Sequence, residues 1–74
     1  MKGNYIAFPS VNYVMKAEDI LKKKNLWYKV VPTPRSIDLS CGISIMYDKK
    51  DEEVIRKLLE QNGVLVRGFY SIEG

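Results

Sequence analysis

Apolar and polar positions follow two different periods along the chain, and each change of period marks an element. Two segments repeat apolar residues at helical spacing, and four short segments are rich in β-branched and aromatic residues. In chain order, the predicted elements are strand 4–8, helix 11–24, strand 27–31, strand 43–47, helix 52–62 and strand 64–72. The pattern therefore predicts the order β-α-β-β-α-β.

The first predicted helix has a narrow apolar face formed by Val14, Ala17 and Leu21. Ser10, which follows Pro9, is a suitable N-cap residue. Asn25 is expected to end this helix. These features predict a helix that packs one face on a core and leaves the other in water.

The second predicted helix has four apolar residues, all of which we expect to face the core: Val54, Ile55, Leu58 and Leu59. Gly63 follows the helix and suits the left-handed conformation that often ends one. Two amphipathic helices and four short strands favour an α+β class. We expect a ferredoxin-like two-layer sandwich, with a four-stranded antiparallel sheet and both helices on one face.

The length of the chain limits its organisation. A chain of 74 residues allows one domain, which we expect to cover residues 1–74. A domain of this size has a thin core, so a functional site is expected on a surface loop or in a shallow groove. Small domains often gain stability by oligomerisation, which makes a homodimer a possible arrangement.

The composition of the chain indicates the cellular compartment of the protein and excludes some kinds of chemical site. No apolar run approaches the length of a membrane span, and the N-terminus has no signal-peptide core. A single cysteine suits a reducing compartment, so we expect a cytoplasmic protein. One cysteine and no histidine exclude an internal disulfide and a zinc site, and we expect no metal and no bound cofactor.

The longest predicted connection, residues 32–42, joins the second and third strands and ends near Cys41. Hairpin loops usually contain two to five residues, and longer ones are often functional. The other candidate residues of this loop are Thr33, Pro34, Arg35, Ser36, Ser40 and Gly42. Any covalent chemistry of this chain is therefore expected at Cys41.

Three short motifs in this order resemble the DUF3343 family, described as selenium/sulfur carrier-like proteins. They are Phe8-Pro9-Ser10, Pro32-Thr33-Pro34-Arg35 and Ser40-Cys41-Gly42. The resemblance extends over nearly the whole chain, including Asn62-Gly63-Val64. It implies a carrier of sulfur or selenium, with Cys41 as the carrier atom, Arg35 and Pro34 in its loop, and donor and acceptor proteins as partners.

The residues around Cys41 suit this role. A carrier needs a thiolate, which cations and backbone N–H groups stabilise. Arg35 is the candidate cation, and Ser36 and Ser40, with Thr33 as a weaker candidate, are possible hydrogen-bond donors. Gly42 lets a partner approach closely. Sulfur or selenium would then be held covalently, as a persulfide or selenosulfide.

Three other interpretations remain open. An interaction or regulatory domain would bury Cys41 as an inert packing residue. An RNA-binding module shares the element order, and Arg67-Gly68-Phe69-Tyr70-Ser71-Ile72 loosely resembles an RNA-binding motif, but on the last strand. The excess of basic residues is too modest to indicate nucleic acid. An enzyme is disfavoured, because the chain has no histidine to act as a base.

Overall fold

A computed structural model describes residues 3–37 and 41–73. The elements are β1 (Gly3–Ala7), α1 (Val11–Lys23), β2 (Tyr28–Pro32), β3 (Ile43–Tyr47), the short 3₁₀ helix η1 (Lys49–Asp51), α2 (Glu52–Gln61) and β4 (Gly68–Ile72). The predicted order β-α-β-β-α-β is confirmed, and so is the ferredoxin-like α+β class.

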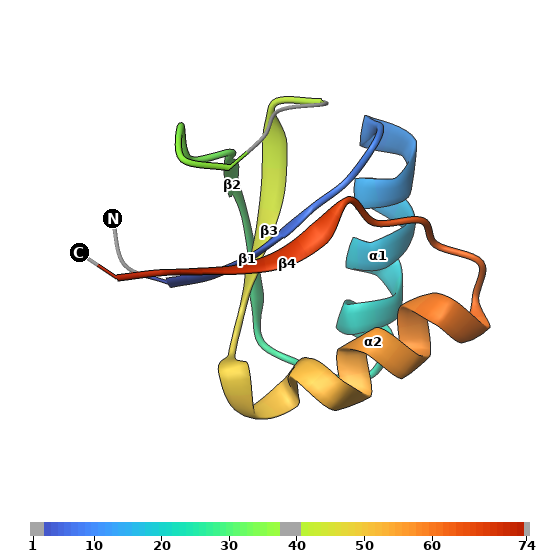
Figure 1. The fold of residues 1–74 in the computed structure, drawn as a ribbon. Coiled ribbons are helices and arrows are strands. Elements are labelled where there is room, and N and C mark those ends of the chain that lie inside the picture. The colour runs from blue at the N-terminus through green and yellow to red at the C-terminus, as the bar shows by residue number, and fades with distance from the viewer. Residues whose placement is uncertain (1–2, 38–40, 74) are drawn as a thin grey trace.

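The four strands form one open antiparallel sheet in the order β2-β3-β1-β4. In the middle of the sheet, Ile45 of β3 lies between Val30 of β2 and Ile6 of β1, and Ile6 pairs on its other side with Phe69 of β4. Both helices lie on the same side of this sheet (Figure 1). The other face has no helix over it, and we call it the open face.

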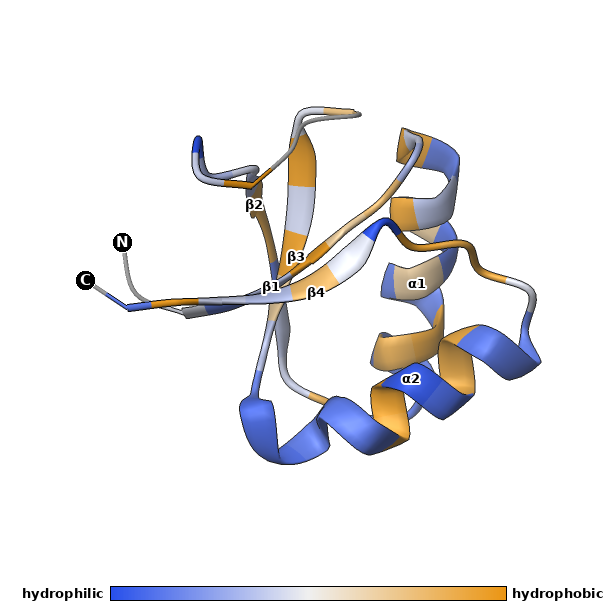
Figure 2. Cartoon of the chain, viewed as in Figure 1, coloured by the Kyte–Doolittle hydropathy of each residue, from blue (hydrophilic) through white to orange (hydrophobic). Residues whose placement is uncertain are grey.

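The main core lies between the sheet and the helices, because alternate residues of each strand point to opposite faces. Apolar parts of both helices turn toward the sheet, and polar parts turn outward (Figure 2). The buried residues of this helix-side core are Ile6, Phe8, Val14, Ala17, Leu21, Ile45, Tyr47, Ile55, Leu59 and Val64. The predicted apolar face of α1 is thus confirmed.

Both helices end with a residue in the left-handed conformation, as predicted. Asn25 has φ 56° and Gly63 has φ 68°. In each case the next residue donates its N–H five residues back, from Leu26 to Leu21 and from Val64 to Leu59. Ser10 is the N-cap residue of α1, although its side chain makes no capping hydrogen bond.

Two predictions about the second half of the chain were wrong. Val54 is 51% exposed. Successive helical residues are about 100° apart, so burying Ile55 and Leu59 leaves Leu58 half-buried and turns Val54 outward. The last strand is also shorter than residues 64–72, because Val64 packs on the core at the end of α2 and the chain pairs with β1 only from Gly68.

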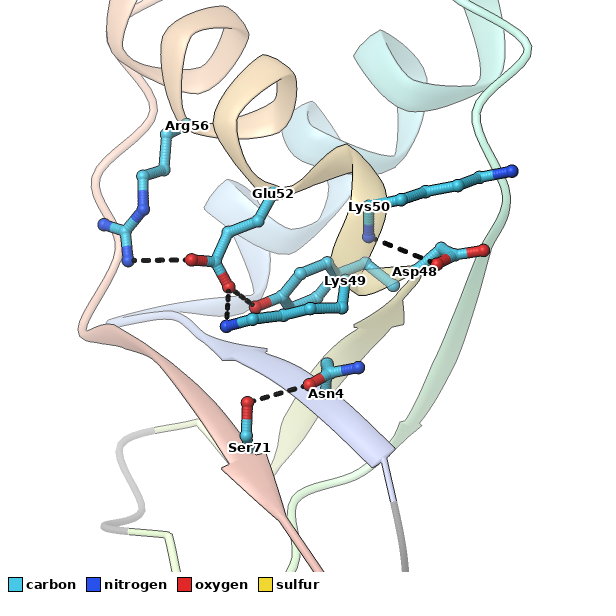
Figure 3. Close-up of polar contacts among 8 residues, drawn as sticks. Asn4, Asp48, Lys49, Lys50, Glu52, Arg56 and Ser71 are labelled. Atoms are coloured by element: carbon cyan, nitrogen blue, oxygen red, sulfur yellow. Dashed lines mark hydrogen bonds and ion pairs between the residues drawn. The ribbon is translucent and has the colours of Figure 1, made fainter.

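A polar cluster joins the start of α2 to the sheet. The Glu52 carboxylate accepts hydrogen bonds from the Tyr47 hydroxyl and from Lys49 Nζ, the latter at 2.8 Å, and lies 3.6 Å from Arg56 (Figure 3). The Arg56 guanidinium stacks 4.1 Å from the centre of the Phe69 ring. The hydrogen bonds from Lys49 and Tyr47 lower the pKa of Glu52, whereas burial and the bond to Glu52 raise the pKa of Tyr47.

Replacing Glu52 with Gln should flatten the dependence of stability on acid pH. Because the folded-state pKa of Glu52 is lowered, its contribution is present above the unfolded-state pKa and is lost as pH falls through the folded-state value. We expect wild type to lose roughly 0.2–1 kcal/mol more than Glu52→Gln on acidification, measured by urea unfolding at several pH values. Glu53→Gln, in the same helical turn, is the control. An identical acid dependence for wild type and Glu52→Gln would contradict this assignment.

Candidate functional site

Hydrogen bonds join the two ends of the connection between β2 and β3 where they meet the sheet. We call this place, formed by Thr33, Gly42 and Ser44, the neck of the loop. The N–H of Thr33 donates to the carbonyl of Gly42 at 2.9 Å. The hydroxyls of Thr33 and Ser44 lie 2.7 Å apart, and Ser44 is fully buried. Since Ser44 pairs with Ala7 on the open face, the Thr33 side chain is directed to that face as well. The neck thus fixes where the chain re-enters the sheet just after Cys41.

The first part of the loop folds back over the open face. The carbonyl of Pro34 accepts a hydrogen bond from the N–H of Ile37 at 3.0 Å, which closes a turn with Arg35 and Ser36 exposed at its tip. Ile37 is 2% exposed and packs in a second cluster with Tyr5 and Ala7. Figure 1 shows this part of the loop on the side of the sheet away from the helices.

Cys41 belongs to the opposite face. It is half-buried and packs against the helix-side core, and its Sγ donates to the carbonyl of Ile43 at 3.4 Å. Gly42 has φ +82°, which favours glycine, and no heavy atom lies within 4 Å of the position that a Cβ would take. A side chain at position 42 would thus meet no described residue other than its chain neighbours, so glycine is required there by its backbone conformation and not by lack of space.

The start of α1 lies at the same end of the sheet as Cys41. Ala7, the last residue of β1, pairs with Ser44 near the start of β3, so the Pro9-Ser10 turn and the Cys41-Gly42 segment leave the sheet at one end. The first turn of α1 has no acidic residue, and no side chain caps it. The N-terminus of a helix favours a negative charge, which makes this end of the sheet suitable for an anionic sulfur.

The structure brings together some of the predicted site residues and separates others. Thr33 and Gly42 meet at the neck, next to Cys41. Arg35 and Ser36 belong to the turn on the open face, and within residues 3–37 and 41–73 no hydrogen bond or ion pair joins Arg35 to Cys41. Ser40 lies outside the described residues. The roles assigned to Arg35, Ser36 and Ser40 stay predictions.

The sequence analysis missed two residues that position the site, Ile37 and Ser44. Ile37 is an apolar residue in an otherwise polar part of the loop, and this contrast was the available signal. Ser44 lies at an alternating position of an apolar strand, where a hydroxyl needs a partner once it is buried. Thr33 supplies that partner.

The family model described as "Putative Se/S carrier protein-like" matches residues 3–71. The chain belongs to this family. Comparison with curated proteins and with solved structures gives no significant match. Family membership confirms the resemblance drawn from the motifs around Cys41.

In this Se/S carrier-like protein, neither helix of the described segments is long and apolar enough to cross a membrane. Those segments also contain no group of three or more cysteine, histidine, aspartate or glutamate residues arranged to hold a metal ion.

The sheet of this carrier-like protein does not present the aromatic surface that an RNA-binding module needs. Base stacking requires exposed rings on the open face. Tyr5 of β1 is fully buried there, and Phe69 of β4 faces the other way, where its ring meets Tyr47 edge to face at a centroid distance of 5.7 Å. Of the aromatic rings in the described strands, Tyr70 alone is half-buried on the open face, and the exposed Trp27 precedes β2 and is not part of the sheet. The geometry therefore disfavours the RNA-binding interpretation.

Shortening Ile37 by one methylene should weaken the anchor of the loop. We expect Ile37→Val to lower the free energy of unfolding by about 0.5–1.5 kcal/mol, because a buried methylene is lost and the cavity refills only in part. The matched control is Val54→Ala, an exposed truncation expected to cost less than about 0.5 kcal/mol. Urea unfolding measures both, and equal small losses would show that Ile37 does not anchor the loop.

Proposed function

We propose that this protein carries sulfur or selenium as a persulfide or selenosulfide on Cys41. The observation on which the proposal rests is the position of the cysteine. In a member of a Se/S carrier-like family, the only cysteine of the chain is half-buried at the end of the sheet, in the segment that leads from the long loop into β3.

The transfer step exchanges one S–S or S–Se bond for another. The Cys41 thiolate attacks the outer sulfur or selenium of a persulfide or selenosulfide on a donor protein. A bond forms between Cys41 Sγ and that atom, the bond within the donor breaks, and its electron pair leaves with the donor thiolate, which takes up a proton. No net oxidation occurs, and delivery to an acceptor repeats the exchange in the opposite sense.

Loading requires Cys41 to lose its thiol proton. The thiol donates to the carbonyl of Ile43, and this bond is available only to the protonated form, so the anion depends on other groups for its stabilisation. A persulfide or selenosulfide on Cys41 is itself acidic. Its negative charge would lie at the end of the sheet where α1 begins. In this account Arg35, in the turn over the open face, adds positive charge to the part of the loop that a partner meets. The hydrogen bond between Thr33 and Gly42 fixes the backbone next to Cys41, so the sulfur keeps one position relative to the sheet.

The chain contains no histidine, the side chain that most often acts as a general base. We therefore propose that the donor and acceptor proteins supply the proton transfers, and that this protein is an accessory carrier of the cytoplasm rather than a self-contained enzyme. In this account, Pro34, Ser36 and Ser40 shape the loop that these partners meet.

Intact-protein mass spectrometry tests the carrier role. Wild type and Cys41→Ser are each incubated with a cysteine desulfurase and either cysteine or selenocysteine, and are then treated with a thiol-blocking reagent. We expect wild type to gain the mass of one sulfur or one selenium atom, and Cys41→Ser to gain neither. The element that loads identifies the cargo.

A wild-type protein that takes up neither a chalcogen nor the blocking reagent while folded would overturn the proposal. Cys41 would then be a packing residue, as in an interaction domain.

A further inference from the structure

Among the described residues, one buried side-chain polar atom has no hydrogen-bond partner, the hydroxyl oxygen of Tyr5. The Tyr5 side chain is fully buried on the open face. Burying a hydroxyl without a partner is costly, so buried hydroxyls in folded proteins are nearly always paired with a protein group, an ordered water or a bound molecule. The Tyr5 hydroxyl therefore indicates a hydrogen bond that is completed from outside the chain.

The Tyr5 ring lies along β1 toward the start of the strand. Its hydroxyl oxygen is 3.3 Å, and its Cε1 is 3.4 Å, from the position that a Cβ on Gly3 would take. The Met46 methyl carbon lies 2.7 Å from the same position. Glycine at position 3 thus leaves room on the open face for the phenol and the thioether to approach the backbone. The Tyr5 hydroxyl lies beside Gly3 and the end of the Met46 side chain.

A cavity of about 450 Å³ lies at the end of the sheet where β1 begins and β3 ends. This volume is within the range of roughly 300–1,000 Å³ that is typical of small-molecule sites. The residues that line it include Gly3, Trp27, Met46, Asp48 and Lys49. The cavity and the Tyr5 hydroxyl therefore share two neighbours, Gly3 and Met46.

Two side chains that line the cavity suit a flat aromatic ligand. Trp27 is 53% exposed, and the face of an indole ring binds other aromatic rings by stacking. Met46 is half-buried, and its unbranched thioether side chain changes conformation readily and makes favourable contacts with aromatic rings. A movement of the Met46 methyl group away from Gly3 would open the Tyr5 hydroxyl to the cavity.

The charges near the cavity favour a ligand with a negative charge. Lys29 is exposed and pairs directly with Met46 across the sheet, so both side chains are on the open face. In the part of the chain that the structure describes, Lys29 is in no ion pair. The other charged groups at the cavity are engaged, because Lys49 is paired with Glu52 and the Asp48 carboxylate accepts a backbone N–H. Lys29 is thus available to an anionic group beside Met46.

We propose that this cavity binds a small planar aromatic anion. The ligand stacks on Trp27 and displaces the methyl group of Met46. An acceptor oxygen of the ligand then takes a hydrogen bond from the Tyr5 hydroxyl, and its negative charge lies toward Lys29. The site is at the end of β3, whereas Cys41 precedes the start of that strand, so this inference does not depend on the carrier function.

Titration with anilinonaphthalene sulfonate, a planar aromatic anion, tests the site. Trp27 is the only tryptophan of the chain, so its indole N–H gives a single signal in a proton–nitrogen NMR spectrum, and we expect this signal to shift until the probe saturates wild type. Tyr5→Phe should raise the dissociation constant by about three- to tenfold, because one hydrogen bond is lost. The matched control is Tyr70→Phe, which removes a hydroxyl that lies over Gly68 at the opposite end of the sheet and should leave binding unchanged.

The stability of the variants without the probe separates a ligand-binding hydroxyl from a structural one. Because the Tyr5 hydroxyl has no partner in the chain, Tyr5→Phe should leave the midpoint of urea unfolding unchanged or raise it. A midpoint below that of wild type would show a partner within the protein and would overturn the proposal. So would a wild-type indole signal that does not shift at millimolar probe, or equal dissociation constants for Tyr5→Phe and Tyr70→Phe.

Discussion

The antiparallel register of β3 between β1 and β2 decides on which face every part of the site lies. Ile43, Ile45 and Tyr47 point to the helices, whereas Ser44 and Met46 point to the open face. A shift of one residue would reverse all of these positions. It would move the Ser44 hydroxyl away from Thr33 into the helix-side core and place three large apolar side chains on the open face, so the register is strongly specified.

This register also separates the two ends of the long loop. Ser44 holds Thr33 on the open face, and the chain then reaches Ile37, which is buried against the same face. Cys41 returns to the helix side and packs against the core there. The two described parts of the loop therefore lie on opposite faces of the sheet, with the turn over one face and the thiol on the other. A half-buried thiol at the end of a sheet can be reached by another protein, in a domain too small for an internal active site.

Most of the fold was predictable because it depends on local periodicity. The faces of α1, the left-handed ends at Asn25 and Gly63, and the bounds of β3 all follow from residue type and spacing. Val54 was misplaced because four apolar residues in one helix exceed the width of the face that the core can bury.

The loop was less predictable because its course depends on contacts between residues distant in sequence. The motifs identified Cys41 and its neighbours, but the burial of Ile37 against Tyr5, more than thirty residues away, depends on the assembled sheet. This contact is what carries the turn with Arg35 away from the thiol, a separation that no spacing rule shows.

The reactivity of Cys41 in the folded protein tests the central claim most directly. The measurement is the rate of alkylation by iodoacetamide across a range of urea concentrations below the unfolding transition, compared with the rate in the unfolded protein. If Cys41 is an accessible acceptor, the native protein reacts directly, and its rate barely changes with urea. A rate that rises with urea in parallel with the unfolding equilibrium would show that the thiol reacts only after the protein opens, and would contradict the account.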